Sequence, residues 1–539
     1  MEAVGLIKKR GKAVMFVFFC LFAAISIRVA FLALKADTTR AATAQGSYTL
    51  TVDCPRGTIY GRNLEHITNH KEIYKAALTP TPEVMAAIYE SFDKQTAEDI
   101  AEQLRSGKPV VTVVPAGFAA KGAKVFKCYD AVPDQQPAVQ LVGYLDAALE
   151  KGVCGLQNVF DSLLCPAGKT KVTYSCDATG GVLLGIDPEI EMDMSQYEKG
   201  IVTTLDLEIQ NICEQALSSV AKGAVVITKT GSGEILAMAS APTFSPDNME
   251  AALKNENAPF VNRCLSEYNL GSIFKICVAA AALENGIATD FSYTCTGSIS
   301  CGNAFGCHKK EGHGQLDMKQ AFANSCNTYF IDLAMQVGAD KIYDMAAKLG
   351  LGTENHLCEG ISGAAGGLGD IEELRAVPAA LANLSLGQGK VMVTPLQISA
   401  LINAVADGGV YFEPYLISGS IDAGGNRNYE RASSGRRVMS VATADQLKEM
   451  MGLVISQGTG VAAAPAEGVC GGKTATAETG WTDTAGNPGT NAWFAGFYEL
   501  GEKRYSISVL AEGGNSGSAS AAPVFQSICN GIAKLQTKE

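Results

Sequence analysis

The chain has 539 residues, of which 47% are hydrophobic and 18% charged, and this apolar content is enough for more than one sizeable core. The composition therefore argues against a disordered protein. The formal net charge of -12 and the pI near 5.1 would repel nucleic-acid phosphates, so no nucleic-acid partner is expected.

A transmembrane anchor is predicted at the N-terminus. An apolar run over residues 13–34 follows a basic cluster made of Lys8, Lys9, Arg10 and Lys12. At about 1.5 Å per residue, a helix of this length spans a bilayer core. The basic flank predicts that residues 1–12 form a cytoplasmic tail and that the rest of the chain is extracytoplasmic. A cleaved signal peptide is the alternative, although the apolar run is long for one.

The region after the anchor is predicted to form a separate domain. Residues 36–47 are small and polar and are typical of a linker. The following sequence mixes strand and helix patterns, with an extended run at 109–115 and an alternating run at 170–174. Residues 35–200 are therefore predicted to be a pedestal or interaction domain of mixed structure.

The pattern changes near residue 200. Residues 207–222 have helical periodicity, and a final helix is predicted from Ala522. Two apolar runs flank a Gly-rich turn and predict a β-hairpin. Strand patterns cover 201–206, 224–229, 234–240, 493–498 and 505–511. Strands at both ends with helices between them predict one mixed α+β domain over 201–539, with its terminal strands in one sheet.

The 16 cysteines are scattered along the chain, and Cys20 lies in the apolar N-terminal run. The nearest candidate for a metal site is the set Cys301, Cys307, His308 and His313, but its spacing fits no standard zinc pattern. A disulfide among Cys295, Cys301 and Cys307 is the simpler interpretation, and free buried thiols are the simpler one for most of the rest. No metal and no cofactor are therefore expected.

A Ser-x-x-Lys pair occurs three times, at Ser91–Lys94, Ser219–Lys222 and Ser272–Lys275. Positions i and i+3 share one face of a helix, so the amine can reach the hydroxyl. Serine needs a base beside it to act as a nucleophile, and lysine can be that base only if burial or a neighbouring cation keeps it neutral. Only the third pair lies among apolar residues, which predicts the start of a buried helix. The first two are predicted to be solvated positions without function.

Two further segments carry chemical groups. In Ser325-Cys326-Asn327 the hydroxyl could relay a proton and the amide could hold a peptide carbonyl, although a helix N-cap or a turn would use the same residues. The literal Lys-Thr-Gly at 229–231 lies in the predicted hairpin turn. The other candidate, Lys473-Thr474-Ala475-Thr476, could present its lysine and threonine to a carboxylate and its backbone N–H groups to a reacting carbonyl.

Taken in order, these three segments resemble the motifs of the penicillin-recognising serine acyl-transferases. More of the chain is similar to this family, in stretches listed here: Tyr268-Asn-Leu-Gly-Ser-Ile-Phe-Lys275, His313-Gly314 before 324–330, Gly387-Gln-Gly389, Val393-Thr-Pro-Leu-Gln397, Trp493-Phe-Ala-Gly-Phe497 and Ala522-Pro-Val-Phe525. Residues 55–63 resemble a stretch near the anchor of class B penicillin-binding proteins. The resemblance covers nearly the whole chain.

The resemblance implies a β-lactamase/transpeptidase-like fold, an antiparallel sheet flanked by helices, behind the pedestal and the anchor. It implies a DD-transpeptidase that cross-links peptidoglycan stem peptides through an acyl-enzyme on Ser272 and is inhibited by β-lactams. Lys275 would be the base, Ser325 the proton relay and Asn327 the group that orients the donor. Lys473 and Thr474 would hold the donor carboxylate. The oxyanion hole would be formed by the N–H groups of Ser272 and Thr476.

The chain departs from the family pattern at Ala475, Leu270 and Gly61, where glycine, proline and aspartate are usual. Glycine allows the strand to approach the nucleophile, so Ala475 puts β-lactam affinity in question. Glu372-Glu373-Leu374 faintly resembles the deacylation loop of a β-lactamase and is predicted to be a helical surface.

Three alternatives to transpeptidation stay open from the sequence alone. They are a DD-carboxypeptidase, a non-catalytic scaffold that binds other membrane proteins of wall synthesis through residues 36–200, and a membrane β-lactam sensor. No glycosyltransferase domain is expected.

Overall fold

The structure is a computed structural model, and it describes residues 2–35, 46–130, 136–146, 151–165, 168–177, 181–429, 433–482 and 488–536. Nearly all of the predicted linker at 36–47 lies outside these ranges. The chain forms two compact units, each discontinuous in sequence. The first contains residues 1–55, 72–129 and 166–194, and the second contains 56–71, 130–165 and 195–539. Two short segments that precede residue 200 therefore belong to the second unit.

The N-terminal helix α1 (Glu2–Lys35) contains the predicted anchor. Its segment Val14–Phe31 has a mean hydropathy of 2.4 and, among the described residues, is the one helix long and apolar enough to cross a membrane. This overlaps the predicted span of 13–34. The helix also extends through the basic cluster that precedes the span.

In the rest of the first unit, the described residues form two three-stranded sheets and two helices. One sheet has the order β1 (Ser47–Asp53), β8 (Thr170–Ser175), β9 (Glu189–Glu191), and the other β4 (Val110–Val114), β3 (Lys71–Leu78), β5 (Ala123–Asp130). Helices α3 (Pro82–Ser91) and α4 (Lys94–Leu104) begin at the N-caps Thr81 and Asp93, whose side chains accept backbone N–H groups. The predicted runs at 109–115 and 170–174 correspond to β4 and β8.

The second unit is built on a five-stranded antiparallel sheet with the order β12-β11-β27-β26-β25. The predicted hairpin is confirmed as β11 (Gly223–Lys229) and β12 (Ile235–Ala241). The C-terminal strands β26 (Pro488–Leu500) and β27 (Lys503–Glu512) complete the sheet with β25 (Val469–Thr482), which forms one edge. Because β11 pairs with β27, the two ends of this domain meet in one sheet, as predicted.

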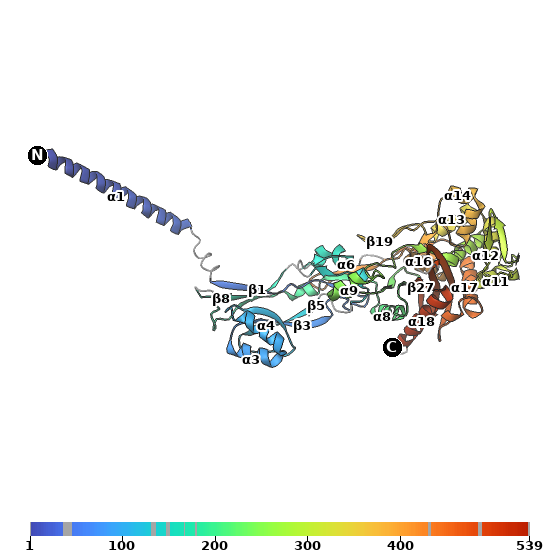
Figure 1. The fold of residues 1–539 in the computed structure, drawn as a ribbon, viewed down its shortest axis with the longest axis horizontal. Coiled ribbons are helices and arrows are strands. Elements are labelled where there is room, and N and C mark those ends of the chain that lie inside the picture. The colour runs from blue at the N-terminus through green and yellow to red at the C-terminus, as the bar shows by residue number, and fades with distance from the viewer. Residues whose placement is uncertain are drawn as a thin grey trace. The chain divides into compact units, whose positions relative to one another are not determined.

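Helices cover both faces of this sheet. Along β11 the side chains of Val225 and Ile227 enter the core under α8 (Leu207–Leu217) and α18 (Ala522–Gln536), while Val226 enters the core on the other face. The alternation follows from the two-residue repeat of a strand, and burial on both faces explains why β11 is apolar throughout. The opposite face packs against α16 (Pro395–Ala406), which is labelled in Figure 1. The residues of this helix are all buried.

One predicted element ends earlier than its pattern. The helical periodicity extends to residue 222, but α8 stops at Leu217. The hydroxyls of Ser218 and Ser219 donate to the carbonyls of Gln215 and Ala216 and so compete with continuation of the helix.

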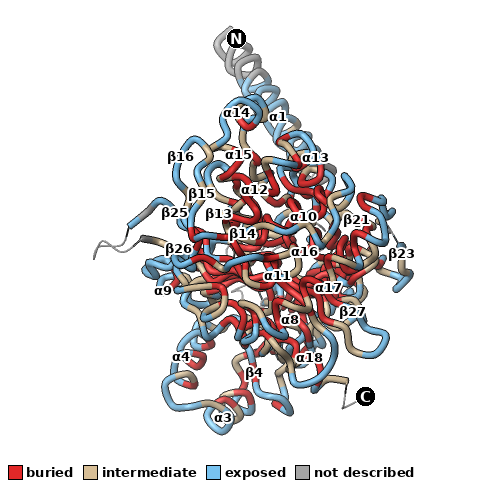
Figure 2. The backbone as a smooth tube through the Cα atoms, turned by 90° about the vertical axis from the view of Figure 1, so that its right-hand side faces the viewer, coloured by how far each residue is buried: buried red, intermediate tan, exposed pale blue. Residues whose placement is uncertain are grey.

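Figure 2 shows that the buried chain is concentrated around α10 and α16, with exposed loops at the periphery.

Candidate active site

Ser272 lies at the start of a buried helix. The turn Gly271–Phe274 is 3₁₀ and leads directly into α10 (Lys275–Glu284), of which residues 275–282 are buried. Gly271 has a φ of +70°, and its N–H donates to the carbonyl of Gly387 at 2.8 Å. The indole N–H of Trp493 holds the preceding chain through the carbonyl of Asn269 at 2.9 Å. The family-like segments at 387–389 and 493–497 therefore fix the backbone that carries the serine, which is itself half-buried.

The amine of Lys275 is fully buried and bound by the Ser-x-Asn segment. Its Nζ donates to the carbonyl of Ser325 at 2.8 Å, to the Ser325 Oγ at 3.2 Å and to the Asn327 Oδ1 at 2.8 Å. The ring of Phe330 lies 5.5 Å from this Nζ. Loss of hydration on burial lowers the pKa of Lys275 to about 7, against a smaller opposing effect from Cys326 and Cys307. A lysine in this state can accept a proton near neutral pH.

Ser325 lies between α11 (Met318–Ala323) and α12 (Asn327–Val337) in a left-handed backbone conformation, with a φ of +53°. This conformation is costly for a residue with a side chain, and such strain is concentrated at functional sites. The N-cap of α12 is Cys326, which makes no side-chain capping bond. The hydroxyl of Ser325 is therefore not used as a helix cap, and it faces the two lysines instead.

Strand β25 brings a second buried amine to the same hydroxyl. Lys473 is fully buried, and its Nζ donates to the Ser325 Oγ at 3.0 Å and to the Thr474 carbonyl at 3.1 Å. Burial, reinforced by the nearby Lys275, holds the pKa of Lys473 well below the usual range for lysine. Two amines that share one acceptor in a dry site repel each other when both are charged, so the pair favours a state with at least one neutral amine.

The open edge of β25 faces the turn that carries Ser272. A Cβ placed on Gly271 would lie 3.2 Å from the Thr476 carbonyl oxygen and 3.3 Å from the methyl groups of Ala475 and Ala477. The carbonyl of Thr476 therefore points toward this turn rather than toward β26. Since the N–H and C=O of one residue in an antiparallel strand point the same way, the Thr476 N–H also faces the turn. The backbone groups of this edge strand that are not paired with β26 therefore lie on the side of the turn that carries Ser272.

Two hydroxyls position the rest of the edge strand. Thr474 Oγ1 lies 2.6 Å from Thr459 Oγ1, and Thr476 Oγ1 accepts the N–H of Gly517 at 3.2 Å. Ala475 is buried beside Gly271, so its methyl group occupies space that the family glycine would leave open. Thr459 could not be selected from its local sequence, because its contact with Thr474 depends on the loop after α17 (Val441–Ser456) passing beside β25.

The competing Lys-Thr-Gly segment belongs to the β11–β12 turn. Lys229 pairs with Glu234 at 3.6 Å, and the N–H of Gly231 donates to Asn403 Oδ1. The Thr230 hydroxyl lies 2.7 Å from Ser506 Oγ. These contacts fix a turn and involve none of the residues around Ser272.

The other two Ser-x-x-Lys pairs do not share a helix face. Ser91 ends α3 and Lys94 begins α4, while Ser219 and Lys222 follow the end of α8. Lys222 is instead paired with Glu512 at 2.8 Å. Of the three pairs, the one at 272–275 is the pair whose lysine is buried, and its serine lies in the turn that leads directly into the helix of that lysine.

The β-lactamase-like segment is a surface helix, as predicted. It forms α14 (Ile371–Ala376), where Glu372 accepts a bond from Arg375 and Glu373 pairs with Lys390 at 2.6 Å.

The cysteines do not follow the predicted disulfide. None of the 16 cysteines forms a disulfide, and Cys301 lies apart from the cluster that Cys295 and Cys307 enter.

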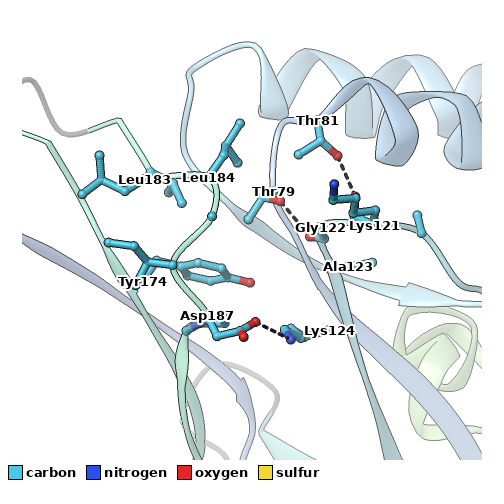
Figure 3. Close-up of a pocket in the computed structure, with 15 residues that line it drawn as sticks. Thr79, Thr81, Lys121, Gly122, Ala123, Lys124, Tyr174, Leu183, Leu184 and Asp187 are labelled. Carbon is cyan, nitrogen blue, oxygen red and sulfur yellow. Dashed lines mark hydrogen bonds and ion pairs between the residues drawn. The ribbon is translucent and has the colours of Figure 1, made fainter.

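A separate hollow of about 390 Å³ lies in the first unit (Figure 3). The hydroxyls of Thr79 and Thr81 donate to the carbonyls of Gly122 and Lys121, and Lys124 pairs with Asp187 at 3.2 Å. Leu183 and Leu184 line the other side of this hollow. The polar side chains are thus largely engaged in structural bonds, and this hollow does not resemble a site for nucleophilic chemistry.

An antiparallel sheet whose edge strand faces a helix-borne serine, with two buried lysines converging on a second serine, defines a serine acyl-transferase of the transpeptidase type. The family model described as penicillin binding protein transpeptidase domain matches residues 223–530, and the chain belongs to this family. The resemblance predicted from the motifs, to class B penicillin-binding proteins and to their fold, is confirmed.

Several named proteins are similar to this chain. Penicillin-binding protein PbpB of Mycobacterium tuberculosis is 29% identical over 482 residues, which cover 81% of this chain and 68% of that protein. Peptidoglycan D,D-transpeptidase PbpA of Mycolicibacterium smegmatis is 30% identical, with 71% and 79% covered. Stage V sporulation protein D of Bacillus subtilis is 30% identical over 61% of this chain, which spans about half of that relative. The crystal structure of penicillin binding protein 3 from M. tuberculosis with aztreonam has a TM-score of 0.66 at 23% identity and covers 91% of this chain and 97% of that one.

Proposed function

We propose that this protein is a peptidoglycan D,D-transpeptidase that uses Ser272 as its nucleophile and is acylated by β-lactams. The observation that carries the proposal is the convergence of two fully buried amines, Lys275 and Lys473, on the Ser325 hydroxyl, with Lys275 at the start of the helix that follows the Ser272 turn. A buried neutral lysine one helical turn from a serine is the base that such a nucleophile needs. The names of the relatives support the same reaction.

The acylation step follows from this arrangement. The neutral amine of Lys275 accepts the Ser272 proton as Oγ bonds to the carbonyl carbon between the two terminal D-alanines of a stem peptide. The oxyanion is stabilised by the N–H groups of Ser272 and Thr476, a contribution of about 3–4 kcal/mol for one such donor. Collapse of the intermediate breaks the C–N bond, and the proton passes through Ser325 to the departing D-alanine amine.

The remaining groups hold the donor in place. Lys473 and Thr474 bind the terminal carboxylate, which stabilises the charged form of Lys473. A cation at Lys473 in turn disfavours a proton on Lys275 and keeps that base neutral. Asn327 orients the peptide, and Ala475 lies along the same edge of the cleft. A hollow of about 620 Å³ lined by Tyr268, Thr479 and neighbouring residues offers room for an extended chain.

In the second half-reaction, the acyl group passes from Ser272 to an acceptor. An amine from a neighbouring strand attacks the ester carbon, the Ser272 C–O bond breaks, and the amine proton returns to the serine oxygen. Water in place of the amine would make the protein a carboxypeptidase. A β-lactam opens its ring on Ser272 and keeps its leaving group attached, so that its deacylation is slow.

The membrane helix sets the location of the reaction. We propose that helix α1 anchors the chain, which its apolar segment Val14–Phe31 supports, and that the transpeptidase domain lies outside the cytoplasm, because basic residues before Val14 favour a cytoplasmic N-terminus. Residues 35–200 are then available to other membrane proteins of wall synthesis.

The test is the intact mass of the detergent-solubilised full chain after incubation with a penicillin. We expect one drug mass on the peptide that contains Ser272, loss of this adduct in Ser272→Ala, and retention in the control Ser219→Ala. A stem-peptide donor with an amine acceptor should then give a cross-linked dimer. An adduct on another residue, or its persistence in Ser272→Ala, would overturn the nucleophile. Hydrolysed donor without dimer would overturn transpeptidation.

A further inference from the structure

Four potential metal ligands meet at the Ser-x-Asn segment, whose middle residue is one of them. Among the residues that the structure describes, the ligand atoms of Cys295, Cys307, His313 and Cys326 all lie within 4.8 Å of one another. We call this set the Cys₃His cluster. Its three cysteines are buried and its histidine is half-buried. Three thiols and an imidazole are the ligand types that zinc binds in closed structural sites.

The fold brings these residues together from four separate positions. Cys295 ends β14 (Tyr293–Cys295) and pairs with Gly314 of β17 (Gly314–Leu316), which places His313 next to it. Cys307 follows β16 (Asn303–Gly306), and its N–H donates to the carbonyl of Gly297. Cys326 comes from the junction of α11 and α12. The spacing between the four residues is irregular, so the cluster depends on the pairing of β14 with β17, on the loop after β16 and on the junction of α11 and α12.

The separations within the cluster match a tetrahedral ion better than a disulfide. The sulfur atoms of Cys307 and Cys326 are 3.9 Å apart, and His313 Nδ1 lies 3.4 Å from Cys307 Sγ and 3.6 Å from Cys295 Sγ. Ligands around zinc, with bonds of about 2.3 Å to sulfur and 2.0 Å to nitrogen, are about 3.8 Å and 3.5 Å apart. A disulfide would require about 2.05 Å. The atoms are therefore spaced as if around a common centre.

We propose that the Cys₃His cluster binds one zinc ion with four protein ligands. Thiolates and imidazole select a soft or borderline cation over magnesium or calcium, and four protein ligands leave no open position for a water nucleophile. The neighbouring Cys301 and His308 lie outside the set, although the sequence pattern had grouped them with Cys307 and His313. The expectation that the chain holds no metal is thereby revised.

The ion would position the second catalytic motif. Cys326 is the middle residue between Ser325 and Asn327, and both of these neighbours accept hydrogen bonds from Lys275. The Asn327 side chain also donates to the carbonyl of Gly306, next to Cys307, at 3.3 Å. Fixing Cys326 to β14 and to the loop around Cys307 holds Ser325 in its strained left-handed backbone. The zinc would thus act through Ser325 and Asn327 and not on substrate.

The first test measures metal in the full chain, purified in detergent without metal-affinity steps. Elemental analysis by inductively coupled plasma mass spectrometry should find about one zinc per chain. X-ray absorption spectroscopy should find three sulfur neighbours of the zinc at about 2.3 Å and one nitrogen at about 2.0 Å. Cys295→Ser and His313→Ala should lose most of the zinc. Cys301→Ser and His308→Ala are matched controls from the same segment and should keep it.

A second measurement remains informative if those variants fail to fold. Wild-type protein stripped with a chelator should lose acylation by penicillin about tenfold and regain it with added zinc but not with magnesium. Metal content is measured whether or not the protein is active, so this proposal can fail independently of the transpeptidase function. Less than a tenth of an equivalent of zinc in folded wild-type protein would overturn it. So would a disulfide between Cys307 and Cys326, or zinc retained in both ligand variants.

Discussion

Two segments of this chain have nearly the same three-residue sequence, but the lysine of one is exposed and the lysine of the other is buried. Lys229-Thr230-Gly231 occupies the β11–β12 turn, where the lysine side chain is 46% exposed and paired with Glu234. Lys473-Thr474-Ala475 lies on the edge strand β25, where the lysine is fully buried and donates to Ser325. The literal match to the family motif is thus the structural turn, and the segment that departs from it reaches the site.

The difference shows what makes a lysine useful for this chemistry. An exposed amine that is paired with a carboxylate stays charged and hydrated, so it contributes little beyond its local ion pair. A buried amine whose acceptors are hydroxyls and carbonyls has lost its hydration without gaining a counter-ion, which leaves it able to bind an incoming anion. Environment, more than the letters, separates the two segments.

Among variants of these two segments, the largest difference should appear when the lysine of each is removed in turn. Lys473→Ala removes the group that binds the carboxylate and one of the two donors to Ser325, and we expect acylation by penicillin to slow about 10²–10³-fold. Lys229→Ala should acylate at the wild-type rate. Stopped-flow fluorescence with a labelled penicillin measures both rate constants, and equal losses in the two variants would remove the basis of the comparison.

The three motifs of the candidate site could be predicted from the sequence, because in each one the side chains with the relevant chemistry lie within a few adjacent residues. The sheet of the second unit could also be predicted, since its strands are apolar runs and a Gly-rich turn separates the first two of them. The Cys₃His cluster could not, because Cys295 and Cys326 meet only through strand pairing and a helix junction that no local pattern encodes.

Two further features could not be predicted from the sequence: the left-handed backbone of Ser325 and the contact of Thr459 with Thr474. Both depend on segments that are distant in sequence. The discontinuous first unit was missed for the same reason, since residues 56–71 and 130–165 fold with the second unit.

The second prediction concerns the pH dependence of acylation, which should distinguish a buried amine from an exposed one. Burial lowers the pKa of Lys275 to about 7, so below that pH the amine becomes an ammonium ion that cannot take the Ser272 proton. The acylation rate should rise with pH, change about tenfold per unit below the pKa, and level off above it. Rates with a labelled penicillin across this range measure the profile, with circular dichroism at each pH to confirm folding.

Two variants serve as controls for this profile. Lys275→Arg keeps a cation at every accessible pH and should not be acylated, whereas Lys94→Ala, which removes the exposed lysine of the Ser91 pair, should reproduce the wild-type curve. A rate that does not change between one unit below and one unit above the pKa would contradict a neutral Lys275 as the base.

The smallest effect concerns the third residue of each segment. Ala475→Gly removes a methyl group that lies against Gly271, which should cost about 0.5–1 kcal/mol of unfolding free energy and open the cleft enough to raise acylation a few-fold. Gly231→Ala places a side chain at a φ of +85°, 3.0 Å from Asp407 Oδ1, and should cost about 1–2 kcal/mol without changing acylation. Urea unfolding and acylation rates on the same two proteins separate the outcomes. If Gly231→Ala slowed acylation while Ala475→Gly did not, the turn rather than the edge strand would be acting on the nucleophile.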